Sequence, residues 1–217
     1  MYLPDHFAET RVDELHQVIT QHPLGALVHQ GPQGLDANHI PFLLDVAPAP
    51  HGTLLAHVAR ANAVWQEVPD GAPVLVIFRA ASAYISPNWY PSKPETHRHV
   101  PTWNYQAVHV HGTLHIRHDE PFLRGVVARL TRDHEHASGQ PRPWKMSDAP
   151  RDYMQQMLQN IVGIEVRITR MEGKWKLGQN REPRDREGAA TGLEQRGDTL
   201  TAEAMREVGR GRTTNLE

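Results

Sequence analysis

Apolar residues recur at intervals of three and four positions in three stretches of the chain, which predicts an amphipathic helix in each. These stretches are residues 12–22, 120–136 and 152–158. Pro23 follows the first stretch directly and is expected to end that helix. A brief helix is also expected within residues 61–68, because Asn62 is of a residue type that caps helix starts.

Strand-like runs make up most of the remaining chain. They cover residues 24–29, 39–45, 53–59, 74–86, 104–117 and 161–171, and a turn is expected at Gly173 before a last run at 174–177. Along 104–117 apolar residues alternate with histidines, which predicts one buried face and one His-rich face. The early runs are joined by connections too short for helical crossovers. The pattern therefore predicts a mainly β fold with flanking helices (α+β), whose antiparallel strands form a meander or barrel.

Composition and charge exclude several classes of function. The chain has 217 residues and no cysteine, which excludes disulfide frameworks, thiolate metal sites and thiol catalysis. Its 23 basic and 25 acidic side chains nearly cancel, so any contact with DNA is expected to be local or indirect. The first residues lack the pattern of a secretory signal, and no apolar run approaches the roughly 20 residues that span a bilayer. We therefore expect a cytoplasmic protein with no membrane partner.

The segment from His57 to Asn62 contains side chains that suit an anion. A strand is predicted to run into a short helix here, and the first turn of a helix offers free backbone N–H groups. Arg60 adds a positive charge and Asn62 adds amide donors, which together suit a phosphate. The alternative is a strand end with a solvated arginine and a helix-capping asparagine.

A proline-stiffened loop over residues 86–103 carries two aromatic clusters, around Trp89 and Trp103. Such clusters form a flat wall for a planar ring system, and isoalloxazine is a ring of suitable size. The hydroxyl, ammonium and amide groups beside them are those of Ser86, Lys93, Thr102 and Asn104. The alternative is a small hydrophobic cluster beneath a long loop.

Histidine is abundant, with 15 in the chain, and His109 and His111 are one residue apart on a predicted strand, so they face the same way. Such a pair suits a metal or an axial haem position. No carboxylate accompanies them on that strand at matching spacing and no H-E-x-x-H motif occurs, so we assign no metal ligand. Glycine motifs for dinucleotides, P-loop phosphates and hydrolase nucleophiles are also absent from the sequence.

Six segments, in order along the chain, resemble the PaiB-type FMN-binding negative transcriptional regulators, whose domain is known as FMN-binding type 2. The segments are Met1-Tyr2-Leu3-Pro4, Asn38-His39-Ile40-Pro41-Phe42, His57-Val58-Ala59-Arg60-Ala61-Asn62, Trp89-Tyr90-Pro91-Ser92-Lys93, Val100-Pro101-Thr102-Trp103-Asn104-Tyr105 and Lys176-Leu177-Gly178-Gln179-Asn180-Arg181. In the last segment Gly178 replaces the serine of the family pattern.

The resemblance implies an antiparallel split β-barrel of the flavin-reductase-like FMN-binding type over residues 1–195, with FMN as cofactor and a homodimer as the assembly. Residues 196–217 lie outside it and are expected to form a weakly packed tail with one helix near 202–208. We predict the cofactor contacts from the matching segments and the polar residues beside them. They are His57, Arg60, Asn62, Ser86, Trp89, Lys93, Thr102, Trp103, Asn104, Gln179 and Arg181.

The resemblance further implies a flavin-linked regulator that acts on DNA directly or through a regulatory protein partner. Two alternatives remain open. The aromatic loop and the barrel type also suit a flavin-dependent oxidoreductase of a small substrate, and the histidines suit a haem-binding protein on the same fold. The sequence assigns no catalytic residue to any of these functions.

Overall fold

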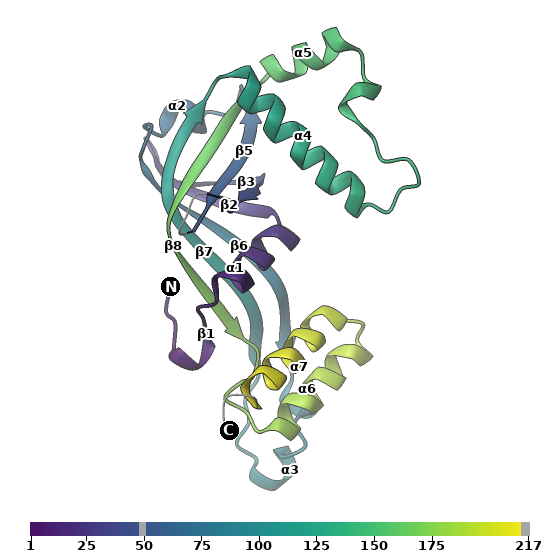
Figure 1. Cartoon of the computed structure of the whole chain (residues 1–217). Helices are drawn as coiled ribbons and strands as arrows, with labels where there is room; N and C mark the ends of the chain where they lie inside the picture. The colour runs from purple at the N-terminus through teal and green to yellow at the C-terminus, as the bar shows by residue number, and fades with distance from the viewer. Residues whose placement is uncertain (48–50, 214–217) are drawn as a thin grey trace. The chain divides into compact units, whose positions relative to one another are not determined.

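The computed structural model describes residues 1–47 and 51–213, in two compact units (Figure 1). Unit 1 consists of Met1–Leu15, Arg79–Val108 and the described residues from Glu172 onward. Unit 2 consists of His16–Phe78 and His109–Met171. Among the described helices, none is both long and apolar enough to cross a bilayer.

The strands form one antiparallel-paired sheet in the described chain, with the order β3-β2-β6-β7-β8-β5-β4 and with β1 paired to β8. Their bounds are β1 Ala8–Glu9, β2 Leu24–Gly31, β3 Gly34–Pro41, β4 Leu43–Asp45, β5 Thr53–Ala59, β6 Pro73–Ile85, β7 Thr102–Arg117 and β8 Ile161–Lys176. The predicted α+β class with antiparallel strands is confirmed. One prediction is wrong: Gly173 is not a turn but lies inside β8, where it pairs with Glu9 of β1.

The helices include every one predicted from apolar spacing. Their bounds are α1 Val12–Gln21, α2 Val64–Glu67, α3 Lys93–Thr96, α4 Glu120–Ala137, α5 Arg151–Gln159, α6 Pro183–Gln195 and α7 Thr199–Thr213, with 3-10 turns η1 Asp5–Phe7, η2 Pro87–Trp89 and η3 Met146–Asp148. Asp119 begins α4, because its carboxylate accepts a hydrogen bond of 3.0 Å from the backbone N–H of Phe122.

The core of unit 2 includes one face of α4 packed against β5 and β4. Leu55 of β5 is buried with Val126 and Leu130 of α4, and Leu43 and Phe122 pack on this cluster. Along β7 the alternation expected from the sequence is confirmed: the even-numbered residues from Val108 to Leu114 are buried, and the histidines between them are half-buried. The period-two pattern thus fixes which face of β7 is covered.

The described end of unit 1, up to residue 213, differs from the weakly packed tail expected over residues 196–217, of which 214–217 lie outside the described residues. Helices α6 and α7 pack on each other, and α7 buries Thr201, Ala202 and Met205 almost fully. Small residues let these helices approach, so the scarcity of large apolar residues does not mean loose packing. The domain boundary expected after residue 195 stays a prediction.

Candidate functional site

The turn between β5 and α2 in unit 2 holds Arg60 in a fixed place. Its guanidinium donates from Nε to the carbonyl of Gln159 over 2.7 Å and from one Nη to the carbonyl of Ile161 over 2.9 Å. The indole of Trp65 donates to the carbonyl of Arg60 over 2.9 Å, and its ring centre lies 6.0 Å from the guanidinium carbon. Arg60 is also exposed. Its guanidinium is thus held in place by hydrogen bonds and is accessible from solvent.

Two of the motif segments meet through a chain of side-chain hydrogen bonds in unit 2. The amide of Asn62 donates to Oδ1 of Asn38 over 2.7 Å, and the amide nitrogen of Asn38 lies 3.2 Å from Nε2 of His29. Oδ1 of Asn62 accepts from the backbone N–H of Val64 over 2.9 Å and so supports the turn that leads into α2, although the N-cap position is Ala63 and not Asn62 as predicted. Both the oxygen and the nitrogen of the Asn62 amide therefore form hydrogen bonds within the protein, and these bonds position the turn against β3.

His57 leaves a buried nitrogen without a partner. It lies on β5 opposite Gly163 of β8, and its Nδ1 is buried with no hydrogen bond to any described residue. Burial lowers the pKa of His57, so the ring is neutral near pH 7. A buried polar nitrogen is normally hydrogen-bonded, so Nδ1 of His57, like that of His29, His51 and His99, can take a further hydrogen bond.

In unit 1 three predicted residues, Ser86, Trp89 and Lys93, belong to the segment expected to be a loop, which contains η2 and α3. Oγ of Ser86 accepts from the N–H of Asn88 over 3.2 Å, and Nζ of Lys93 donates to Oδ1 of Asn88. Trp89 packs on α6, where a Cβ at Gly192 would lie 2.5 Å from its indole. These contacts support the hydrophobic-cluster alternative for Trp89.

The next three predicted residues lie at the start of β7 and point to different surroundings. Thr102 accepts a hydrogen bond of 2.6 Å from Nζ of Lys176. Trp103 is 51% exposed and donates from its indole to Oγ of Ser82 over 2.8 Å. Asn104 is buried, and its amide lies 3.5 Å from the sulfur of Met205 on α7. Trp103 and Asn104 therefore leave β7 on opposite faces, and the Asn104 amide faces α7.

Gln179 and Arg181, the last two predicted residues, follow β8. Gln179 spans its own turn, because its side chain accepts from Leu177 over 2.8 Å and donates to Trp175 over 2.5 Å. The guanidinium carbon of Arg181 lies 5.3 Å from the ring centre of Tyr90. Gly178 has a φ of 84°, a left-handed conformation that glycine adopts at little cost.

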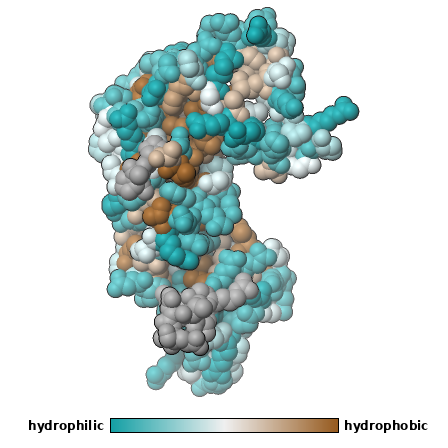
Figure 2. Space-filling model, viewed as in Figure 1, coloured by the Kyte–Doolittle hydropathy of each residue, from teal (hydrophilic) through white to brown (hydrophobic). Residues whose placement is uncertain are grey.

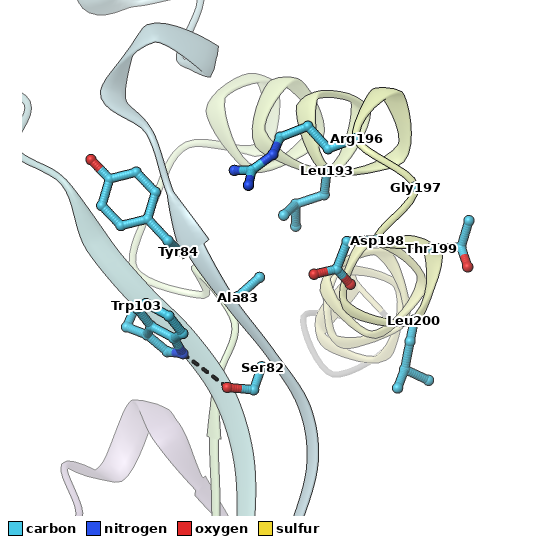
Figure 3. A pocket seen from close by; sticks show the side chains of 10 residues that line it. All are labelled: Ser82, Ala83, Tyr84, Trp103, Leu193, Arg196, Gly197, Asp198, Thr199 and Leu200. Carbon is cyan, nitrogen blue, oxygen red and sulfur yellow. Dashed lines mark hydrogen bonds between the residues drawn. The ribbon is translucent and has the colours of Figure 1, made fainter.

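A pocket of about 520 Å³ lies within unit 1, beside the turn between α6 and α7 (Figure 3). Trp103 is the one predicted residue that lines it. The other lining residues are Ser82, Ala83, Tyr84, Leu193, Arg196, Gly197, Asp198, Thr199 and Leu200. The lining residues from Arg196 to Leu200 fall in the tail that the sequence predicts to be weakly packed, which is why the sequence assigns them no role. A usable signal was Gly197 followed by Asp198, which is typical of one helix ending and the next beginning.

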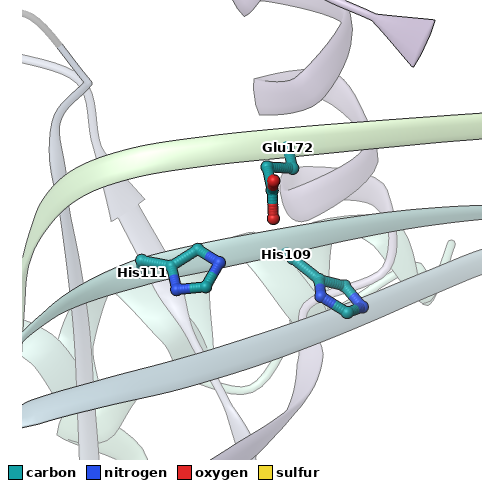
Figure 4. A group of neighbouring side chains, drawn as sticks. All are labelled: His109, His111 and Glu172. Carbon is teal, nitrogen blue, oxygen red and sulfur yellow. The ribbon is translucent and has the colours of Figure 1, made fainter. Parts of the chain in front are cut away.

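The two histidines predicted to lie on one strand and face the same way are both on β7. His109 and His111 are both half-buried and project from β7 in unit 2, while Glu172, drawn with them, belongs to β8 in unit 1 (Figure 4). The prediction of no metal ligand stays a prediction. Of the predicted site residues, the structure places His57, Arg60 and Asn62 in unit 2 and the other eight in unit 1.

The sequence is similar to that of known proteins along most of its length. The family model described as "Putative FMN-binding domain" matches residues 1–170. An uncharacterized protein of Aspergillus fumigatus is 34% identical over 91% of this chain and 92% of its own. Protease synthase and sporulation protein PAI 2 of Bacillus subtilis is 29% identical over 85% of each chain.

Two solved structures share the fold at low sequence identity. The flavocytochrome Anf3 from Azotobacter vinelandii has a TM-score of 0.52 and 12% identity over 79% of this chain and 70% of its own. The FAD and haem binding protein from Mycobacterium smegmatis has a TM-score of 0.51 and 15% identity over 79% and 74%. The likeness supports the predicted fold class and carries no residue roles.

Proposed function

Because the chain belongs to the PaiB-type family of FMN-binding domains, we propose that it binds a flavin, with FMN as the natural form, and acts as a flavin-linked regulator. The observation that carries the flavin is the polar turn between β5 and α2. There Asn62 and Asn38 join two family segments, and Nδ1 of His57 is buried without a partner.

The residues of this turn fit the polar end of FMN. Arg60 would hold the phosphate by charge, since its guanidinium is already oriented by Gln159 and Ile161. The neutral ring of His57 would hydrogen-bond a ribityl hydroxyl or phosphate oxygen, and Asn62 would position the turn. A bound flavin supplies reversible one- and two-electron redox chemistry. The packing of Trp103 against the flavin ring stays a prediction.

Titration of flavin-free protein with FMN and with riboflavin tests the phosphate assignment, because the two ligands differ by the phosphate alone. Arg60→Ala should weaken FMN by about 1.5–3 kcal/mol, one to two decades, and leave riboflavin nearly unchanged. Arg124→Ala is the control, since this exposed arginine of α4 bonds Glu120. Equal losses for both flavins, or none for FMN, would remove Arg60 from the phosphate site.

The regulatory role would follow from a homodimer whose state responds to the flavin. Large apolar side chains are exposed in both units, among them Tyr84 and Trp103 in unit 1 and Tyr153 in unit 2, and hydrophobic residues appear among hydrophilic ones on the face in Figure 2. A dimer would cover some of them. Light scattering at micromolar concentration should give twice the 24.5 kDa chain mass, and the monomer mass would contradict the dimer.

A gel-shift assay tests regulation through DNA, with the promoter region next to the gene as probe and oxidised or reduced FMN present. We expect binding that differs between the two flavin states at one stated salt concentration. Identical shifts in both states, or no specific shift, would contradict direct regulation. The cytoplasmic localisation expected from the sequence is part of this proposal and stays a prediction.

A further inference from the structure

The pocket of unit 1 has two opposite charges on one wall. Arg196 and Asp198 are separated by one residue, Gly197, in the turn that joins α6 to α7 (Figure 3). Gly197 has a φ of 83°, which allows the chain to reverse between the helices. The reversal brings a guanidinium and a carboxylate to the same pocket.

Neither charge is neutralised by an ion pair with another described residue. The guanidinium carbon of Arg196 lies 5.7 Å from the ring centre of Trp89, a cation–π contact that leaves its hydrogen-bond donors available. The carboxylate of Asp198 accepts a hydrogen bond of 3.2 Å from the backbone N–H of Thr201, which caps α7. A carboxylate that accepts one hydrogen bond at a helix start has further acceptor positions.

The remaining walls are aromatic and aliphatic. Tyr84 and Trp103 have ring centres 6.4 Å apart with planes at 67°, and they expose 43% and 51% of their surface. Because Ser82 holds the indole N–H, Trp103 presents its ring surface rather than its donor. Leu200, which is 52% exposed, adds an aliphatic wall. Such walls favour a ligand with an apolar ring.

We propose that this pocket binds a free amino acid with an aromatic side chain, with its carboxylate at Arg196, its ammonium at Asp198 and its ring against Tyr84 and Trp103. An aromatic carboxylate would leave the Asp198 charge unpaired beside the ligand, and an aromatic amine would do the same to Arg196. A zwitterionic amino acid offers a carboxylate to Arg196 and an ammonium to Asp198, so both charges of the pocket are paired. The site lies wholly in unit 1, whereas the residues proposed for the phosphate end of FMN belong to unit 2. Trp103 is shared with the predicted flavin contacts, so competition with FMN is part of the test.

Calorimetric titration of the full chain with L-phenylalanine tests the proposal. 3-Phenylpropionate lacks the ammonium, 2-phenylethylamine lacks the carboxylate and L-alanine lacks the ring. We expect saturable binding of L-phenylalanine, with each of the other three at least about tenfold weaker, the change that one lost charged or ring contact produces. No saturable binding of L-phenylalanine, or equal binding of L-phenylalanine and 3-phenylpropionate, would overturn the proposal.

Asp198→Asn removes the negative charge but keeps the cap of α7, because asparagine is as good a helix cap as aspartate. This variant should keep the fold, weaken L-phenylalanine about tenfold and remove its advantage over 3-phenylpropionate. Glu203→Gln, at an exposed position of α7, is the matched control and should bind like the parent chain. An unchanged preference in Asp198→Asn would overturn the assigned role. Competitive displacement of L-phenylalanine by FMN would assign the pocket to the flavin instead.

Discussion

Replacement of Gly192 by alanine tests the contact that holds Trp89 against α6. A Cβ at this position would lie 2.5 Å from two indole atoms of Trp89 and 2.7 Å from a third, whereas carbon atoms in contact are normally about 3.5–4.0 Å apart. The indole therefore has to move by about 1 Å in a packed interface, which costs about 1–3 kcal/mol. The higher helix propensity of alanine stabilises the folded chain by about 0.5–1 kcal/mol, which offsets part of this cost.

We therefore expect Gly192→Ala to lower the free energy of unfolding by up to about 2.5 kcal/mol. Gly125→Ala is the matched control, because Gly125 lies in α4 with nothing within 4 Å of the added Cβ. It should raise the free energy of unfolding by about 0.5–1 kcal/mol through helix propensity alone. Urea unfolding followed by circular dichroism measures both. Equal stabilisation by the two substitutions would show that Trp89 does not pack on α6.

Three further substitutions test other parts of the structure by urea unfolding. Leu55→Ala removes a buried side chain between β5 and α4 and should lower the free energy of unfolding by about 2–5 kcal/mol, and a change under 1 kcal/mol would contradict the core described here. Asn104→Ala should lower it by about 0.5–1.5 kcal/mol, whereas no loss would mean that the amide of Asn104 does not bond Met205. Burial holds the pKa of His57 in the folded chain below its ordinary value of 6.5. Below pH 6.5 the unfolded chain therefore binds a proton at His57 more readily than the folded chain, and the free energy of unfolding falls as the pH drops from 6.5 toward the folded pKa. His57→Gln should therefore flatten the decline in stability below pH 6.5, and an unchanged slope would show that His57 titrates normally.

Much of the fold follows from periodicity along the chain. The alternation along β7 fixed its buried face, and the spacing of three and four fixed α1 and α4, because burial of one face is the dominant requirement in both. The sequence predicted a turn at Gly173, whereas β8 continues through this residue. Its continuation depends on pairing with β1, more than 160 residues away, and local turn preference carries no information about that partner.

The candidate site was predicted less completely than the fold. Arg60 and Asn62 are predicted together because both lie within one short segment, but the hydrogen bond to Asn38 links the turn after β5 to β3 and is visible only in the structure. The side chains of Arg196 and Asp198 were missed for a related reason. The packing of α6 on α7 uses alanine and glycine, which a search for large apolar residues passes over.

The absorbance spectrum of the purified chain, recorded after incubation with FMN and gel filtration, tests flavin binding most directly. Flavin bands in the near-ultraviolet and blue are expected to elute with the protein, at one FMN per chain. A protein peak without flavin absorbance would contradict the proposed function. A Soret band in the chain as purified, with no uptake of FMN, would assign the fold in this protein to haem instead.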